Sequence, residues 1–250
     1  MNAFRHDERK GRHKVSTFDC SQNDVVKSGR WCNFVLMQDS FKYKGMRRKL
    51  IEELEAKGIQ DQRILDAFDA VPRHYFLDNA FAEQAYSNMA FQIGSGQTIS
   101  HPYTVAFQTE LLDLKKGDKV LEIGSGSGFQ TSILCEMGAK VFSIERHKPL
   151  HLKAKNILRH LHYNARLSFG DGYKGLPTFA PFDKVIITCG APNVPQALID
   201  QLRVGGVMVI PIGEGEEQQM KRITKVSETE LEEEDFGVFK FVPMLENKVK

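Results

Sequence analysis

Residues 120–128, VLEIGSGSG, constrain the fold of this chain more than any other stretch. The apolar residues Val120, Leu121 and Ile123 predict a short buried strand. The three glycines that follow at every second position allow the backbone to turn tightly into a helix that begins near Phe129. Because a helix N-terminus presents unpaired N–H groups, this turn favours an anionic or strongly polar ligand. The stretch therefore predicts a strand, a turn and a helix, with a ligand lying on the turn.

An acidic residue after the next predicted strand narrows the class of ligand. Residues 141–144 form that strand, and Glu145 follows about 20 residues after Gly124, where an open α/β sheet places a carboxylate against ribose hydroxyls. The dinucleotide fingerprint requires Gly-x-Gly-x-x-Gly, whereas this loop reads Gly-Ser-Gly-Ser-Gly, so a nicotinamide-dependent dehydrogenase is disfavoured. The loop, the strand and the acid together resemble the cofactor site of class I S-adenosylmethionine (AdoMet) methyltransferases.

The charge balance argues against two kinds of partner. The chain has 34 Lys and Arg residues against 32 Asp and Glu residues, a net charge of +2. Such a balance provides no broad field for holding nucleic acid or a membrane surface. No apolar run approaches the roughly 18 residues of a membrane span, and the polar N-terminus lacks the apolar centre of a signal peptide. We expect a cytoplasmic protein with no nucleic-acid or membrane partner.

The cysteines and histidines predict no metal site. The four cysteines form no Cys-x-x-Cys pair and no zinc spacing, which favours reduced, structurally incidental thiols. Histidines occur in pairs near both ends of a predicted helix after Pro149, but no cluster of carboxylates accompanies them. The cysteines are Cys20, Cys32, Cys135 and Cys189.

A change in composition near residue 37 divides the chain. Residues 1–36 are polar and aperiodic, and we predict a disordered extension for which Met37 is a candidate natural start. From there, residues 37–92 show helical spacing of apolar side chains, with Asp61 as the cap of a second helix. Residues 93–250 carry the predicted AdoMet-binding core and the C-terminal strands. We expect residues 37–250 to form one domain.

Strands and helices alternate along that core and predict an α/β fold. The strands at 120–123, 141–144, 167–169, 182–188 and 207–210 favour a mostly parallel, Rossmann-like sheet with helices on both faces. The alternating segments 218–226 and 236–244 predict late antiparallel strands. The acidic run 228–235 between them is predicted to be a solvated loop.

Two short motifs allow both a structural and a functional interpretation. Ser100 precedes Pro102, which suits the first turn of a helix, so its hydroxyl is either a cap or near-cap of that helix or a functional group. Asp171 lies between Gly170 and Gly172 at the end of a predicted strand. That pattern occurs in ordinary turns and also where a backbone approaches a ligand closely.

Several longer stretches carry a more specific pattern: GQTISHPYTVA, VLEIGSGSGFQTSILCEMGAKVFSIER, FGDGYKGLP, FDKVIITCGAP and RVGGVMVIPIG. Together they resemble the protein-L-isoaspartate O-methyltransferase family over about residues 37–242. The resemblance implies a class I methyltransferase fold with extra N-terminal helices and a late pair of strands. It also implies AdoMet as methyl donor, S-adenosyl-L-homocysteine as product, no metal, and isoaspartyl proteins and peptides as substrates.

The resemblance also assigns roles to individual residues. It puts the active-site hydroxyl on Ser100 and an adenine-side contact on Asp171 with Gly172. Two departures from the pattern of bacterial relatives, His101 for glutamine and Cys189-Gly190 for alanines, fall on the expected substrate side. The remaining AdoMet contacts fall on Gly124, Ser125, Gly126, Gly128 and Glu145.

The implied chemistry is methyl transfer from a sulfonium to the free carboxylate of an isoaspartyl residue. A carboxylate has a reference pKa near 4 and is ionised at neutral pH, so no general base is required. Ser100 is therefore expected to position the carboxylate by hydrogen bonding. The alternatives are a methyltransferase for another small molecule or RNA and a non-catalytic AdoMet-binding protein. We expect a monomer.

Overall fold

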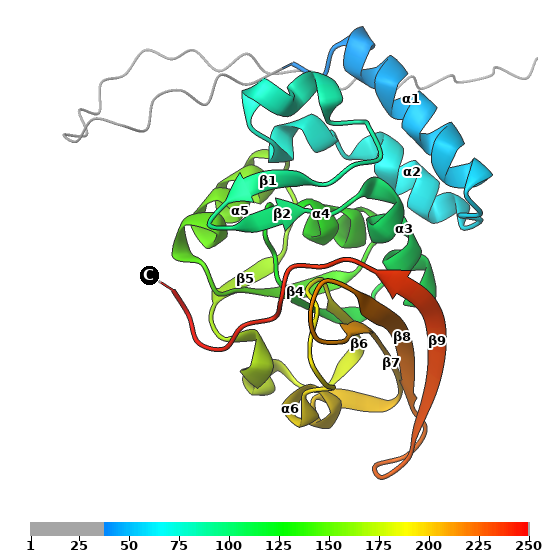
Figure 1. Ribbon diagram of the computed structural model, residues 1–250, viewed down its shortest axis with the longest axis vertical. Coiled ribbons are helices and arrows are strands. Elements are labelled where there is room, and N and C mark those ends of the chain that lie inside the picture. The colour runs from blue at the N-terminus through cyan, green and yellow to red at the C-terminus, as the bar shows by residue number, and fades with distance from the viewer. Residues whose placement is uncertain (1–37, 250) are drawn as a thin grey trace, which may run out of the picture. The chain divides into compact units, whose positions relative to one another are not determined.

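The computed structural model describes residues 38–249, so the predicted disordered extension lies outside the described residues. A seven-stranded sheet has the order β5-β4-β3-β6-β7-β8-β9 (Figure 1). The strands β3 to β7 are parallel, and β8 and β9 are antiparallel to their neighbours. The strands are β3 (Lys119–Ile123), β4 (Lys140–Glu145), β5 (Arg166–Phe169), β6 (Phe182–Ile187), β7 (Leu202–Ile212), β8 (Gln218–Lys225) and β9 (Leu231–Phe239). This is the mostly parallel, Rossmann-like sheet predicted from the sequence, with the late strands antiparallel.

The order of the strands reverses at β3. The chain runs from β3 outward through β4 to β5, then returns to the other side of β3 and continues through β6 and β7. In open α/β sheets, ligands bind outside the carboxyl ends of the strands at such a switch point. The fold therefore places its ligand crevice between the ends of β3 and β6.

Helices cover both faces of the sheet because the central strands are apolar on both sides. Val120 packs in a cluster with Leu112 and Leu134, on the side of α3 and α4. Its neighbour Leu121 packs in a different cluster with Leu198 of α6. The α-helices are α1 (Phe41–Ala56), α2 (Gln62–Ala70), α3 (Pro102–Leu111), α4 (Phe129–Glu136), α5 (Lys148–His160) and α6 (Gln196–Asp200). Short 3-10 helices are η1 (Arg73–Phe76), η2 (Asn79–Gln84), η3 (Gly172–Lys174) and η4 (Pro177–Phe179).

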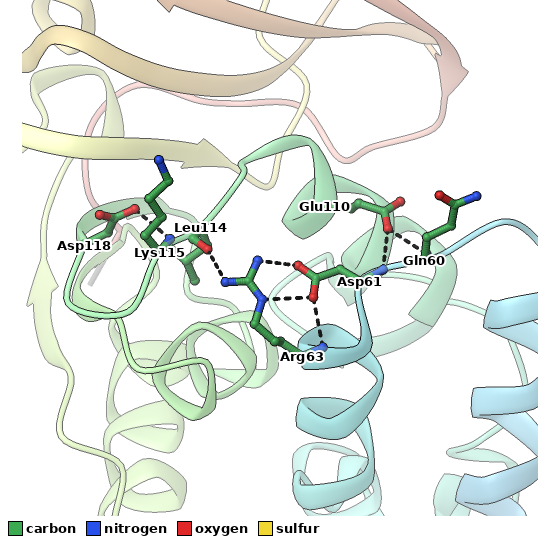
Figure 2. A network of polar contacts seen from close by, with 7 residues as sticks. All are labelled: Gln60, Asp61, Arg63, Glu110, Leu114, Lys115 and Asp118. Carbon is green, nitrogen blue, oxygen red and sulfur yellow. Dashed lines mark hydrogen bonds and ion pairs between the residues drawn. The ribbon is translucent and has the colours of Figure 1, made fainter.

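A polar network joins the start of α2 to α3 and the turn that follows it (Figure 2). Asp61 caps α2 as predicted, accepting a hydrogen bond from the backbone N–H of Arg63 at 2.9 Å. Glu110 of α3 accepts hydrogen bonds from the backbone N–H groups of Gln60 and Asp61, at 2.7 and 3.0 Å. Arg63 also donates to the carbonyl of Leu114 at 2.9 Å. These bonds fix α2 against the helix that follows Ser100.

A small antiparallel hairpin connects those helices to the core. Its strands are β1 (Phe91–Gly94) and β2 (Gln97–Ile99), and α3 begins shortly afterwards at Pro102. Phe91 and Ile99 are buried in the cluster that also holds Phe129 of α4. The hairpin therefore lies over the start of α4, next to the glycine loop (Figure 1).

The prediction for the acidic run was wrong, because most of it lies in β9. Lys221 of β8 pairs with Glu233 at 2.9 Å and with Asp235 at 3.4 Å, and Arg222 pairs with Glu234 at 2.7 Å. Opposite charges on adjacent strands stabilise pairing of this kind. The acidic residues alone predict a loop, because the basic residues that pair with them lie on another strand.

Residues 240–249, here called the C-terminal segment, also differ from the predicted strand. Figure 1 shows the chain leaving β9 and crossing the edge of the sheet where the parallel strands end. Isolated bridges join Pro243 to Gly190 and Val249 to His147. The segment thus pairs with the ends of β6 and β4 rather than extending the last hairpin.

None of the helices in residues 38–249 is long and apolar enough to cross a membrane.

Candidate active site

A cavity opens at the switch point, lined by segments that are far apart in the sequence. The glycine loop and the ends of β4 and β6 form one part of its wall. The hairpin end, from Gln97 to Ser100, forms another, and Val242 to Leu245 of the C-terminal segment close a third. Six of the eight predicted site residues line this cavity: Ser100, Gly124, Ser125, Gly126, Glu145 and Gly172.

The glycine loop has a backbone conformation that side chains disfavour. Gly124 has φ +96° and Gly126 has φ +52°, both in the left-handed region. A Cβ on Gly124 would lie 2.7 Å from Oγ1 of Thr188. That hydroxyl donates to the carbonyl of Gly124 at 2.8 Å, so β6 holds the loop from one side. The glycines are needed here both for the turn and for the close approach of Thr188.

Glu145 braces the same loop from the end of β4. Its Oε2 accepts a hydrogen bond from the backbone N–H of Gly126 at 2.9 Å, and its Oε1 accepts from that of His147 at 2.8 Å. The residue is 4 % exposed and lines the cavity. Each carboxylate oxygen has a second acceptor position, which suits the ribose hydroxyls predicted for this residue.

Gly128 and Asp171 lie beside the cavity and are not part of its lining. A Cβ on Gly128 would meet Ala154 and Leu158 of α5 at 3.4 and 3.5 Å, which makes it a packing position. Asp171 accepts from the backbone N–H groups of Tyr173 at 3.0 Å and Asn247 at 3.1 Å. Its carboxylate therefore holds both a turn and the C-terminal segment. The ligand contacts predicted for these two residues stay predictions.

Gly172, next to Asp171, does line the cavity. A Cβ at this position would lie 2.5 Å from Cγ2 of Ile123. The absence of a side chain therefore lets the backbone at Gly172 pack directly against the end of β3.

Ser100 does not cap α3. The N-cap residue is His101, whose side chain forms no capping bond, and the helix starts at Pro102. The Ser100 hydroxyl forms no hydrogen bond with any residue in the described part of the chain, although its backbone carbonyl accepts one from Arg73. The sequence allowed either a capping or a functional role for this hydroxyl, and the helix geometry does not support the capping role. Ser100 lines the cavity.

The two departures on the expected substrate side have different surroundings. Cys189 lines the cavity, and burial raises the pKa of its thiol to about 12, which keeps it neutral at neutral pH. Gly190 instead pairs with the C-terminal segment, donating to the carbonyl of Val242 at 2.8 Å and accepting from Met244 at 2.7 Å. A Cβ at Gly190 would lie 2.8 Å from the side chain of Gln218.

A buried carboxyl group lies under the glycine loop. Glu122 of β3 accepts a hydrogen bond from the Thr131 hydroxyl of α4 at 2.5 Å and is fully buried. Burial raises the pKa of Glu122 to about 7. The neighbouring hydroxyls of Ser125 and Ser143 are 2.5 Å apart, so the loop rests on a polar core.

Three features that shape the cavity or hold its lining residues cannot be recognised from the sequence. Thr188 ends a strand that reads only as buried, and its bond to the loop depends on the pairing of β3 with β6. The C-terminal segment reads as part of a hairpin. Arg73 lies in an aromatic-rich connection and has no motif around it. No local signal marks any of the three, because each acts on a segment distant in the sequence.

Among residues 38–249, no group of three or more His, Cys, Asp or Glu side chains is arranged to hold a metal ion.

Comparison with known proteins identifies related sequences over most of the chain. The family described as protein-L-isoaspartate(D-aspartate) O-methyltransferase (PCMT) matches residues 45–249. A protein of Cytophaga hutchinsonii named protein-L-isoaspartate O-methyltransferase is 57 % identical over 209 residues, covering 84 % of this chain and 95 % of its own. A protein of Flavobacterium psychrophilum with the same name is 55 % identical over 213 residues, covering 85 % and 100 %.

Solved structures show the same architecture. A structure named protein-L-isoaspartate O-methyltransferase superposes with a TM-score of 0.73 at 28 % identity, covering 80 % of this chain and 66 % of the other. A PCMT from Plasmodium falciparum, solved in complex with S-adenosyl-L-homocysteine, superposes with a TM-score of 0.71. It covers 80 % of this chain and 99 % of its own and, at 24 % identity, supports the fold alone.

Proposed function

The chain belongs to the protein-L-isoaspartate(D-aspartate) O-methyltransferase family, and from this premise we propose how its cavity acts. The enzyme transfers a methyl group from AdoMet to the free carboxylate of L-isoaspartyl residues in damaged proteins and peptides, which initiates repair through a succinimide. One observation carries the proposal: Ser100 and the AdoMet-type loop with Glu145 line the same cavity. Donor and acceptor therefore meet in one place.

The residues on the cofactor side fit AdoMet. Gly124 and Gly172 pack so closely against Thr188 and Ile123 that a Cβ would clash there, and Glu145 offers acceptor positions at the end of β4. In this proposal Gly124, Ser125 and Gly126 hold the methionine part, Glu145 the ribose, and Gly172 with Asp171 the adenine side, while Gly128 supports the loop. When bound, AdoMet supplies a methyl group on a sulfonium.

On the acceptor side, the Ser100 hydroxyl donates a hydrogen bond to the isoaspartyl carboxylate and fixes its direction. No side chain needs to remove a proton, because the carboxylate is already ionised at neutral pH, with a reference pKa near 4. The neutral Cys189 thiol and the apolar residues of the C-terminal segment exclude water from this side. Alignment of this kind contributes about 7 to 11 kcal/mol in well-oriented systems.

The proposal also covers the partners, the location and the oligomeric state of the enzyme. A net charge of +2 supports action without nucleic acid or a membrane. We assign the chain to the cytoplasm as a monomer, with residues 37–250 as the catalytic domain. Light scattering on the purified chain tests the monomeric state.

The test of the activity is methyl incorporation into two matched peptides, one with an isoaspartyl and one with an aspartyl residue. We expect transfer to the isoaspartyl peptide alone. Equal use of both peptides would refute the substrate assignment, and binding of AdoMet without transfer to either would favour a non-catalytic protein. Transfer to a small molecule or RNA only would favour the other methyltransferase class.

The role of Ser100 is tested with Ser100→Ala. Loss of a positioning hydroxyl should reduce kcat more than about tenfold, or about 1.4 kcal/mol of barrier, with little change in AdoMet affinity or melting temperature. Ser87→Ala, at an exposed serine outside the cavity lining, is the matched control and should keep full activity. Undiminished kcat in Ser100→Ala would remove Ser100 from the reaction.

A further inference from the structure

Arg73 is a buried cation with no acidic partner in the described part of the chain. It lies in η1 and is 1 % exposed. Among residues 38–249 it forms no ion pair, and no carboxylate influences its pKa. Buried charges in proteins are normally paired with an opposite charge, because removing an ion from water is costly. The contrast with the other buried arginine is clear, since Arg47 pairs with both Asp39 and Asp69.

The contacts of Arg73 join the two sides of the cavity. Its Nη2 donates to the backbone carbonyl of Ser100 at 2.8 Å, and its Nε donates to that of Ala85 at 2.9 Å. Its guanidinium lies over the ring of Phe129, 4.7 Å from the ring centroid. Ser100 carries the acceptor-side hydroxyl, and Phe129 begins the helix after the glycine loop. Arg73 therefore holds the acceptor segment against the cofactor loop.

The charge of Arg73 also reaches the acceptor side. Burial lowers the pKa of its guanidinium to about 9, so the group stays charged at neutral pH. The pKa of His101, the residue after Ser100, is lowered mainly by burial and additionally by the charge of Arg73. The Nη1 atom has no hydrogen-bond partner within residues 38–249. A positive field without a protein counterion therefore extends toward the place where the acceptor binds.

We propose that Arg73 is a positioning residue for the acceptor: its bonds fix Ser100, and its charge is balanced by the carboxylate of the incoming isoaspartyl residue. This inference rests on the proposed function. In a site of low dielectric the attraction between the two charges is strong, so the anion binds more tightly than a neutral group of the same shape. Methyl transfer turns the carboxylate into a neutral ester. The same charge thus favours substrate over product and helps the product to leave.

Two substitutions separate the charge of Arg73 from its geometry. Lysine keeps the charge but cannot donate to the carbonyls of both Ser100 and Ala85 as the guanidinium does, whereas methionine keeps the approximate volume and loses both the charge and the bonds. In Arg73→Lys we expect kcat to fall at least fivefold while KM for the isoaspartyl peptide stays within threefold of wild type. In Arg73→Met we expect KM to rise at least tenfold and kcat to fall as well. AdoMet affinity should change less than threefold in both.

The matched control is Arg47→Lys, which weakens a buried arginine outside the cavity lining. It should lower the melting temperature without changing KM for the peptide. If Arg73→Met leaves KM unchanged, or if Arg73→Lys raises KM as much as Arg73→Met does, the charge does not act on the acceptor. A kcat of Arg73→Lys equal to wild type would overturn the positioning of Ser100.

A binding measurement on the wild-type chain keeps the inference testable even if Arg73→Met does not fold. Calorimetry in saturating S-adenosyl-L-homocysteine compares an isoaspartyl peptide with its neutral isoasparaginyl twin. We expect at least tenfold tighter binding of the charged peptide, and the same ratio in Arg73→Lys. A ratio below threefold in wild type overturns the inference. If wild type methylates no isoaspartyl peptide, the proposed function itself fails, so the two failures are distinguishable.

Discussion

The cofactor side and the acceptor side of the cavity are built in different ways. The cofactor side comes from two neighbouring parallel strands, and its main elements, the glycine loop and Glu145, lie close together in the sequence. The acceptor side depends on Arg73, Ser100 and Phe129, which come from η1, the end of the hairpin and α4. A local motif therefore forms the first side, and long-range packing forms the second. Substitutions on the first side should change AdoMet affinity, and those on the second should change use of the peptide.

The largest effect is expected for Gly124→Ala on the cofactor side. An alanine here would be strained for two reasons. Its backbone would have to keep a left-handed conformation, with φ +96°, and its Cβ would lie 2.7 Å from Oγ1 of Thr188. Strain of this kind costs about 3 kcal/mol, which weakens AdoMet binding roughly a hundredfold. Calorimetric titration with AdoMet measures the change.

Gly117→Ala is the matched control for that experiment. Gly117 has a similar φ of +92° but nothing within 4 Å of a Cβ, and it lies before β3, outside the cavity lining. It should lower stability by about 1 kcal/mol with unchanged AdoMet affinity. Equal losses of affinity in both variants would show that strain alone, and not the loop, is responsible.

A smaller effect on the same side is expected for Glu145→Ala. The change removes the acceptor for the backbone N–H groups of Gly126 and His147 together with the proposed ribose contact. AdoMet should bind about 1 to 3 kcal/mol more weakly, the scale of a lost hydrogen bond to a charged group. Glu110→Ala, which breaks the network of Figure 2 outside the cavity lining, should lower the melting temperature only. Unaltered affinity in Glu145→Ala would contradict the cofactor assignment.

Beneath the cofactor side, Glu122 should make folding stability depend on pH. Its ordinary pKa is 4.5, and burial raises the folded-state pKa to about 7. Between these two pH values the folded protein keeps a proton on Glu122 that the unfolded chain has lost. The contribution of Glu122 to folding stability is therefore complete below about pH 4.5 and is lost as the pH rises through 7. Glu122→Gln cannot ionise and should lack this loss, which is on the order of 1 to 3 kcal/mol.

Denaturant unfolding of wild type and Glu122→Gln at several pH values from 4 to 8 checks that sign. The stability of wild type relative to the variant should fall across this range and then level off. Parallel curves for the two proteins would mean that Glu122 does not hold its proton in the folded state.

The smallest effect is expected for removal of residues 1–36. The family match starts at residue 45, and the cavity described here is lined by residue 97 and later positions. A chain beginning at Met37 should keep kcat, both KM values and melting temperature close to those of the full chain. A marked loss of activity or of folding would show that the extension contributes to catalysis or stability.

The sequence alone determined the strand, the glycine turn and the terminal acid of the proposed cofactor side, because these are local patterns with local causes. A positive φ at Gly124 and a carboxylate at the end of β4 follow from spacing within one strand–helix–strand unit. The specific stretch around Ser100 was also recognisable from its residues. In each of these features the backbone conformation is set by residues that are close in the sequence.

Only the tertiary structure decided how the acceptor side closes. The C-terminal segment lies across the ends of β4 and β6, and Arg73 reaches the carbonyl of Ser100; outside the cavity lining, the acidic run pairs with β8 as part of β9. Cross-strand ion pairs require a register that one strand does not specify. The partners of Arg73 are backbone carbonyls, which every residue possesses, so its role depends on how distant segments pack together.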